Sequence, residues 1–260
     1  PMKHHTTFRV GGPAEYYLRP KKEQVAEVLR LCLTYQKEYL IIGNGSNLLV
    51  SDKGISGVVI EIGKQMDEIT VDGTTIYAQA GAMLSKTAHA ALEAGLTGME
   101  FAAGIPGCVG GAVVMNAGAY GGEMKKILKS VTVLTADGQE KELTPGELDM
   151  SYRHSSITEE HYMVLGVTIA LEAGRQEQIR AKMEELKEKR VEKQPLEYPS
   201  AGSTFKRPEG YFAGKLIMDA GLRGFQVGGA AVSEKHCGFV INKEKATASD
   251  VYRLIQEVQQ

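Results

Sequence analysis

The spacing of hydrophobic and polar positions predicts a chain in which helices alternate with short strands. Apolar side chains return every three or four residues, which is helical spacing, in 22–37, 84–94, 176–193 and 248–259. Short apolar or alternating runs, typical of strands, occupy 39–42, 58–62, 74–80, 131–135, 140–143 and 162–171. Residues 6–13 read as an extended segment that ends in a turn. We therefore expect a mixed α+β fold.

Capping and turn residues mark where several of these elements begin or end. Gly95 follows the second helix as its expected C-cap, and Asp137-Gly138 between two strands is a strong hairpin signal. Thr247, with Asp250 three residues later, predicts a capped start for the last helix.

The helix expected at 176–193 has one unusual apolar face. Ile179, Met183 and Leu186 share a stripe that Arg190 continues, so we expect this arginine to face inward rather than toward solvent.

Two glycine-rich stretches point to a ligand. Residues 104–121 hold six glycines and almost no charge, unlike a polar linker. Because interior glycine costs roughly 0.5–1 kcal/mol, we expect no packed helix or strand there, but a backbone that approaches a ligand. Residues 43–47, Gly-Asn-Gly-Ser-Asn, lie between two expected strands, 40–42 and 48–50.

Bare N–H groups in such loops can hold a pyrophosphate. Neither stretch matches the Rossmann or Walker A motif, and each alone could be a tight turn. Together they favour a large phosphate-bearing cofactor.

Composition bounds the remaining possibilities. The 260 residues are 43% hydrophobic and 24% charged, as in globular proteins, and a net charge of −2 gives no case for nucleic acid. With no apolar run near the ~20 residues of a membrane span and no signal peptide at the start, we expect a cytoplasmic protein without a membrane partner. Cys32, Cys108 and Cys237 lack metal-ligand spacing and are expected to be reduced, and nothing indicates an oligomeric state.

Two polar loops carry candidate chemistry. In residues 200–208, Ser203 follows small residues and precedes Lys206 and Arg207, an arrangement that suits a phosphate or carboxylate. The loop is not a Gly-x-Ser-x-Gly elbow, which disfavours a hydrolase triad. Tyr152-Arg153-His154-Ser155 is a second polar loop. Each could instead be a solvated surface turn.

Taken in order, the motifs resemble the UDP-N-acetylenolpyruvoylglucosamine reductase (MurB) family over essentially the whole chain. They are residues 5–13, 43–47, 104–107, 116–121, 152–155, 201–206, 221–224, 227–230 and 236–242. Each motif is weak alone, but the ordered set is specific. The short route from Asn116 to Ser203 resembles the compact type, which lacks an inserted tyrosine loop.

The resemblance implies an FAD-binding fold of the vanillyl-alcohol-oxidase-like (PCMH) type with a C-terminal substrate-binding domain. We expect two FAD-binding subdomains, at 1–52 and 53–173, and a substrate domain at 174–260. The FAD-binding residues carried over are Gly43, Asn44, Gly45, Ser46, Asn47, Gly104, Ile105, Gly110, Gly111, Asn116 and Gly118.

The implied reaction uses NADPH to reduce UDP-N-acetylglucosamine enolpyruvate to UDP-N-acetylmuramate. Arg153 matches the arginine that stabilises the enolate, and Ser203 matches the proton donor. Arg190, Lys193, Lys206 and Arg207 match basic residues that bind the substrate, although some relatives carry asparagine in place of Arg207.

The end of the chain departs from the family pattern. The family has a catalytic glutamate in a run after the last helix, whereas this sequence ends at Gln260 before such a run and Glu257 is not that residue. We expect the natural protein to continue. Two other functions stay open: another FAD-dependent oxidase or dehydrogenase of the same fold, and a nucleotide-binding module without catalysis.

Overall fold

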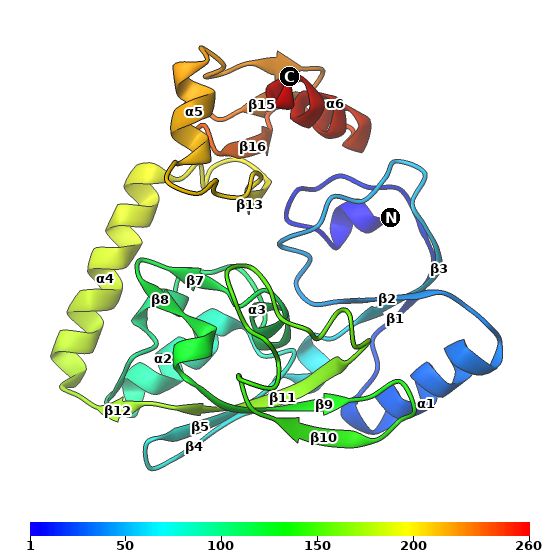
Figure 1. The fold of residues 1–260 in the computed structure, drawn as a ribbon, viewed down its shortest axis with the longest axis vertical. Coiled ribbons are helices and arrows are strands. Elements are labelled where there is room, and N and C mark those ends of the chain that lie inside the picture. Colours follow the sequence, from blue (N-terminus) through cyan, green and yellow to red (C-terminus); the bar gives the residue numbers. More distant parts are fainter. The chain divides into compact units, whose positions relative to one another are not determined.

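Two units, each made from separated stretches of chain, form the fold (Figure 1). The structure is a computed structural model that describes all residues 1–260. Unit 1 contains Pro1–Tyr16, Gly45–Gly57 and Lys189–Gln260, and unit 2 contains Tyr17–Asn44 and Val58–Glu188.

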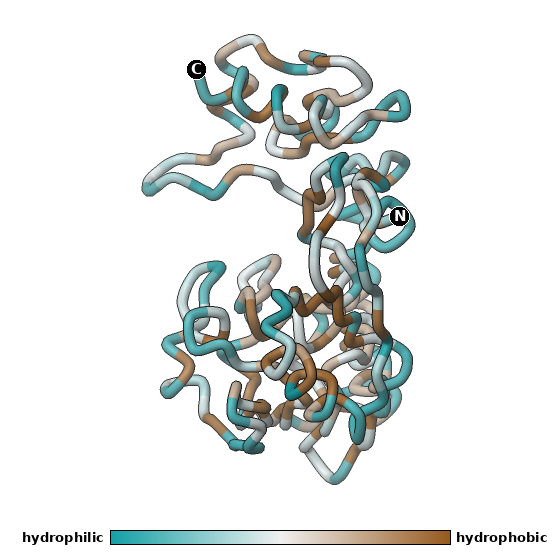
Figure 2. The backbone as a smooth tube through the Cα atoms, turned by 90° about the vertical axis from the view of Figure 1, so that its right-hand side faces the viewer, coloured by the Kyte–Doolittle hydropathy of each residue, from teal (hydrophilic) through white to brown (hydrophobic).

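Unit 2 is built on an antiparallel five-stranded sheet in the order β10-β9-β11-β5-β4. Helices α2 (Leu84–Glu93) and α3 (Val109–Val114) lie on one face of this sheet (Figure 1), and their apolar side chains join its core. Figure 2 shows hydrophobic segments gathered inside this unit. The strands are β4 (Ile69–Asp72), β5 (Thr75–Gln79), β9 (Leu128–Leu134), β10 (Glu140–Leu143) and β11 (Met163–Ala170).

A smaller sheet carries the first glycine loop at one strand end. Its order is β1-β3-β2, and β2 pairs in parallel with β3. Helix α1 (Lys22–Thr34) leads into β2 (Tyr39–Ile42), after which the loop begins at Gly43. Both β1 (Ala14–Leu18) and β3 (Ile55–Glu61) run from one unit into the other. Unit 2 also contains four two-residue strands, β6 (Leu96–Thr97), β7 (Gly118–Ala119), β8 (Gly122–Glu123) and β12 (Glu172–Ala173).

Unit 1 contains a four-stranded sheet in the order β13-β16-β15-β14. Helix α4 (Gln176–Lys193) enters this unit at its C-terminal end, and α5 (Ala213–Asp219) and α6 (Ala248–Gln259) belong to it. The strands are β13 (Ser200–Ser203), β14 (Gln226–Val227), β15 (Ala230–Val232) and β16 (Phe239–Asn242).

The units do not follow the boundaries expected from the sequence at 52 and 173. Phe8 and Val10 pack into the core of the C-terminal part, Thr7 Oγ1 donates to Ser200 O at 2.6 Å, and Asn242 Nδ2 donates to Phe8 O at 3.1 Å. The first residues therefore belong with the last ones. As functional divisions, the three expected ranges stay a prediction.

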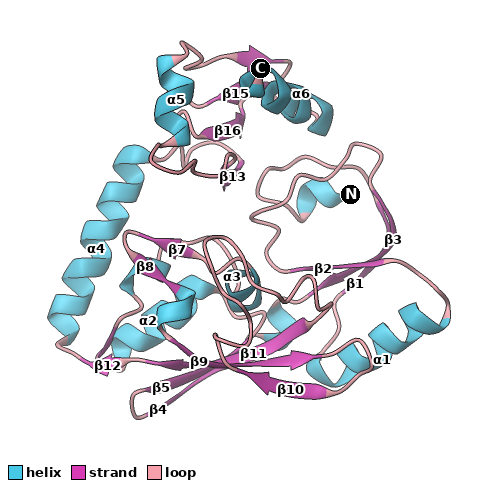
Figure 3. Ribbon diagram, viewed as in Figure 1, coloured by secondary structure: helices cyan, strands magenta, loops and turns pink.

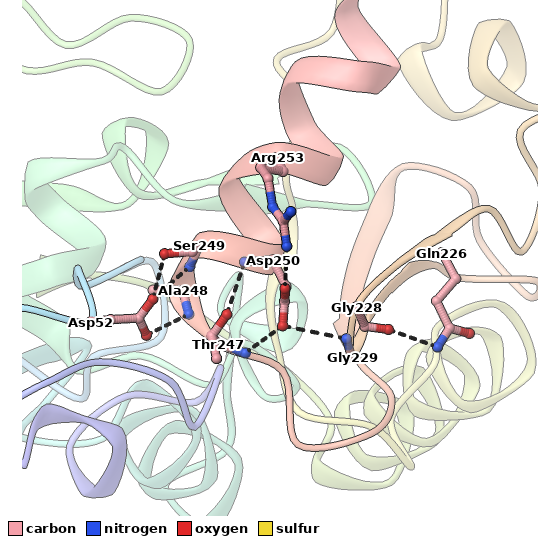
Figure 4. A network of polar contacts seen from close by, with 9 residues as sticks. All are labelled: Asp52, Gln226, Gly228, Gly229, Thr247, Ala248, Ser249, Asp250 and Arg253. Atoms are coloured by element: carbon pink, nitrogen blue, oxygen red, sulfur yellow. Dashed lines mark hydrogen bonds and ion pairs between the residues drawn. The ribbon is translucent and has the colours of Figure 1, made fainter.

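A carboxylate also fastens residues 45–57 to α6 (Figure 4). Asp52 accepts from Ala248 N and Ser249 N, both at 2.8 Å, and from Ser249 Oγ at 2.7 Å. Burial opposes the charge, but these three hydrogen bonds prevail and lower the pKa of Asp52. The start of α6 is thus satisfied by a residue almost two hundred positions away.

The last helix is also capped locally, as the sequence predicts. Thr247 and Asp250 form the capping box, and the Thr247 N–H is the main reason that the pKa of Asp250 falls to about 2. The predicted bounds of α4 and α6, the hairpin at Gly138 and the cap at Gly95 are confirmed.

Four local predictions are wrong. The glycine stretch contains α3, because close packing outweighs the low helix propensity of glycine: a Cβ on Gly110 would lie 2.9 Å from the Ala80 Cβ. Residues 48–50 form no strand, since the chain turns at 51–54 before β3 begins. Residues 6–13 start with a turn rather than an extended segment, and Arg9 N donates to Thr6 O at 3.2 Å. The first helix also ends early, at Thr34, because Gln36 adopts a φ of 50°.

Candidate active site

The two glycine stretches meet within unit 2. A Cβ on Gly43 would lie 2.1 Å from Cys108 Sγ, so only glycine fits at the end of β2. The next residue, Asn44, donates from Nδ2 to Pro106 O at 2.6 Å. The loop predicted to hold the pyrophosphate is therefore joined to the segment predicted to hold the rest of the cofactor.

The first loop presents unused backbone donors. None of the four N–H groups from Asn44 to Asn47 donates to another protein group. Gly45 is buried with a φ of 60°, and its carbonyl accepts from Thr7 N at 3.1 Å. Because buried N–H groups are nearly always paired in proteins, the unpaired N–H of buried Gly45, with unpaired N–H groups on either side, fits an anion such as a diphosphate.

The second stretch uses some of its donors in packing. Val109 N donates to Ala82 O and Gly110 N donates to Ala80 O, both at 2.8 Å. Gly111 differs, because a Cβ there would meet only Cys108 Sγ, at 3.7 Å. Gly110 is thus required by the fold, whereas the space at Gly111 leaves room for a ligand. Gly104 is exposed and Ile105 half-buried. Both precede α3, whose place in the fold Figure 3 shows.

Asn116 supports the site rather than presenting its side chain to a ligand. It is 1% exposed, and its Nδ2 donates to Glu123 Oε2 at 3.1 Å and Ser151 O at 2.9 Å. Its Oδ1 accepts from Lys125 N at 2.9 Å. Both donors are therefore used within the protein, and the side chain fixes the loop that leads to Arg153.

Arg153 stands on a tight turn fastened to the second glycine stretch. Ser151 and His154 exchange two backbone hydrogen bonds, of 3.1 and 3.2 Å, and Arg153 takes a φ of 56° between them. Ser155 Oγ donates to Val114 O at 2.8 Å, and Arg153 donates to Gly118 O at 3.2 Å. Within unit 2, the guanidinium of Arg153 therefore lies beside the predicted cofactor segment.

Ser203 lies at the end of β13 in unit 1. It pairs with Phe239 of β16 across a register irregularity at which Gly202 has a φ of 79°. The next residue is held too: Thr204 N donates to Gly238 O at 2.9 Å, and Thr204 Oγ1 accepts from Val240 N at 3.2 Å. The serine is exposed, on a backbone fixed on its C-terminal side.

The predicted basic residues differ in environment within unit 1. Arg190 is half-buried and Lys193 exposed, both in the last turn of α4, which agrees with an inward-facing arginine. Lys206 is exposed. Arg207 donates to Tyr211 O at 3.2 Å and stacks 4.0 Å from the centroid of the Phe212 ring, so its planar group is already oriented.

Sequence reasoning missed the residues that hold Ser203. Gly238 acts through its backbone N–H and carbonyl, whereas His236 and Thr204 also accept through side-chain atoms, Nδ1 and Oγ1. The sequence displays these residues within the motifs at 201–206 and 236–242, but nothing in it indicates their contacts. No group of three or more histidine, cysteine or acidic residues is placed to hold a metal ion. None of the helices combines the length and apolar character needed to cross a membrane.

Comparisons with known proteins match two parts of the chain to two family models. A family model for an FAD binding domain matches residues 14–144, and one for the C-terminal domain of UDP-N-acetylenolpyruvoylglucosamine reductase matches 194–260. The reductase of Agathobacter rectalis is 58% identical over 100% of this chain and 87% of its own length. That of Clostridium perfringens strain SM101 is 56% identical over 100% and 85%.

Solved structures agree. The crystal structure of the Thermus caldophilus reductase (MurB) superposes with a TM-score of 0.87 at 38% identity, over 99% of this chain and 92% of that one. A glucose dehydrogenase, wild-type Phl p 4.0202, reaches a TM-score of 0.50 at 14% identity, over 65% and 38%. The second likeness shows only that the FAD-binding fold is shared.

Proposed function

The chain belongs to the UDP-N-acetylenolpyruvoylglucosamine reductase family, and on that premise we propose how its own residues carry out the family's reaction. The protein is an FAD-dependent oxidoreductase that uses NADPH to reduce UDP-N-acetylglucosamine enolpyruvate in peptidoglycan synthesis. This excludes the oxidase and the non-catalytic module as readings of the sequence.

The loop from Gly43 to Asn47 is proposed to hold the FAD diphosphate, because its N–H groups are unused. The rest of FAD is proposed to lie along the backbone of Gly104, Ile105, Gly110, Gly111 and Gly118. Asn116 holds this segment in place through its side-chain hydrogen bonds. Bound there, FAD would supply the hydride chemistry by which NADPH reduces the terminal carbon of the enolpyruvyl group.

Arg153 is proposed to stabilise the charge that this transfer creates. Hydride addition to a carboxylate-bearing alkene moves an electron pair toward the carboxylate, so a fixed cation there gains in the transition state. The guanidinium donates a hydrogen bond to Gly118 O and lies over the Tyr152 ring, 5.2 Å from its centroid. Its remaining donors suit a planar carboxylate.

Ser203 is proposed to donate the proton to the carbon next to the carboxylate. A hydroxyl is a weak acid, but the acceptor is a strong carbon base. Arg190, Lys193, Lys206 and Arg207 are proposed to bind the anionic sugar nucleotide. A cytoplasmic location, and the lack of nucleic-acid or membrane partners, stay predictions.

The single observation that carries this mechanism is the fastening of the Arg153 turn to the glycine stretch. The test follows flavin absorbance without oxygen, with NADPH added first and the enolpyruvyl nucleotide second. We expect bleaching, then rapid return of colour. Bleaching without return would contradict reduction of the enolpyruvyl nucleotide as the second half-reaction, and a protein that never takes up FAD would contradict the role of both glycine stretches.

A further inference from the structure

Two hydrogen bonds through Gly238 link the side chain of His236 to the residue that follows Ser203 in unit 1. His236 Nδ1 accepts from Gly238 N at 3.1 Å, and Gly238 O accepts from Thr204 N at 2.9 Å. Both groups of the Gly238 residue are therefore engaged, one by the imidazole and the other by the residue after the serine.

The imidazole itself is held in place. Its ring packs edge-on against Phe239, the β16 residue that pairs with Ser203, with centroids 4.9 Å apart. The backbone of the same turn is fixed by Ser233 Oγ, which accepts from His236 N at 3.2 Å. On α5, a Cβ on Gly214 would lie 3.4 Å from His236 Cε1, so this helix packs against the ring.

We infer that neutral His236 is a positioning residue: by accepting from Gly238 N, it holds Gly238, whose carbonyl fixes the residue after Ser203, and so sets the Ser203 hydroxyl for proton donation. This rests on the role proposed for Ser203. A ring nitrogen accepts only while it carries no proton, so protonation of His236 removes the acceptor and leaves the Gly238 N–H without its partner.

Charged neighbours do not keep the imidazole protonated. On its own turn and on the elements packed around it, the charged groups are engaged elsewhere: Lys235 with Val191 O, Glu234 with Lys243, and Lys215 with Asp219, while Lys206 is exposed. Burial lowers the pKa of His236, which keeps Nδ1 an acceptor at neutral pH.

The test separates the two half-reactions of the FAD-loaded protein by stopped flow between pH 5 and 8. His236→Leu removes the acceptor, and we expect flavin reoxidation by the enolpyruvyl nucleotide to slow about ten- to a hundredfold, with flavin reduction by NADPH unchanged. His236→Asn keeps an acceptor near the Nδ1 position but cannot titrate. It should retain most of the reoxidation rate and lose the fall in rate below the ordinary histidine pKa of about 6.5.

His89→Asn is the matched control, because His89 is exposed in unit 2, where its Nδ1 lies 2.7 Å from Ser85 O. This variant should keep the acid fall. Reoxidation at the wild-type rate in His236→Leu, or an unchanged acid fall in His236→Asn, would overturn the inference. Ser203→Ala distinguishes the failures: if it reoxidises normally, the proposed serine role and the inference both fall, and if it is slow while His236→Leu is fast, only the inference falls.

Discussion

Replacing Gly43 by alanine tests whether the contact between the two glycine stretches is as tight as the structure indicates. The new Cβ would lie 2.1 Å from Cys108 Sγ, whereas carbon contacts are favourable at about 3.5–4.0 Å. The sulfur is buried, so one side must shift by more than an ångström. Overpacking of this kind costs about 1–3 kcal/mol.

The same geometry predicts a rescue. With Cys108→Ala the sulfur is gone, and the Cβ added at residue 43 would lie 3.6 Å from the Cβ at residue 108, an ordinary contact. Gly43 does not adopt a positive φ, so alanine is otherwise acceptable there. We expect the double variant to recover most of the stability that Gly43→Ala loses, with a coupling energy of about 1–3 kcal/mol.

Thermal unfolding and FAD affinity of the wild type, both single variants and the double variant measure this cycle. Each kcal/mol lowers the unfolding midpoint of a chain this large by about 2–4 °C, and we expect FAD affinity to follow, since Asn44 leads directly into the unpaired donors. A Gly43→Ala protein as stable as the wild type, or a double variant no better than it, would refute the reasoning.

Three further predictions concern the carboxylates that hold the start of α6, Asp52 and Asp250, and the arginine of the reaction. Asp52→Ala should cost about 1–2 kcal/mol, as caps do, and amide exchange in 248–251 should quicken about 5–30-fold; unchanged exchange would contradict this. The pKa of Asp250 is about 2 in the folded protein, so its contribution to stability is present above the ordinary value of about 4 and lost as the pH falls toward 2. Asp250→Asn should remove that dependence in acid unfolding followed by circular dichroism, and an identical profile would argue against it. Arg153→Lys keeps the charge but loses the planar donors, and should slow flavin reoxidation by the substrate about a hundredfold without slowing flavin reduction by NADPH; equal effects on both steps would count against its proposed role.

The sequence predicts an element well where the residues of that element determine its bounds. Helix α4 has a long periodic stripe and α6 a capping box, and both bounds agree with the structure. The glycine stretch shows the limit of this reasoning. By propensity no helix should form there, yet α3 forms against residues some thirty positions earlier: Val109 N and Gly110 N donate to Ala82 O and Ala80 O, and the Ala80 Cβ leaves no space for a side chain at Gly110.

The candidate site likewise combines residues that the sequence predicts with contacts that only the structure shows. Arg153 and Ser203 come from motifs that the sequence displays, and the structure adds the groups that hold them. Those groups are backbone atoms, such as Gly118 O and Gly238 O, which every residue type carries. Only the folded chain can reveal them, just as only the fold joins Phe8 to the C-terminal core.

The path of the chain has a consequence for its synthesis. It passes between the units after Tyr16, Asn44, Gly57 and Glu188, so unit 2 is complete once Glu188 has left the ribosome. Residues 1–16 have to wait, because Phe8 packs in a cluster whose later members lie between Ala201 and Val258. At roughly 5–20 residues per second, that wait after Glu188 lasts several seconds, during which the side chains of Phe8 and Val10 are uncovered. The order of synthesis and the order of packing are thus opposed, and residues 1–16 are packed among the last parts of unit 1.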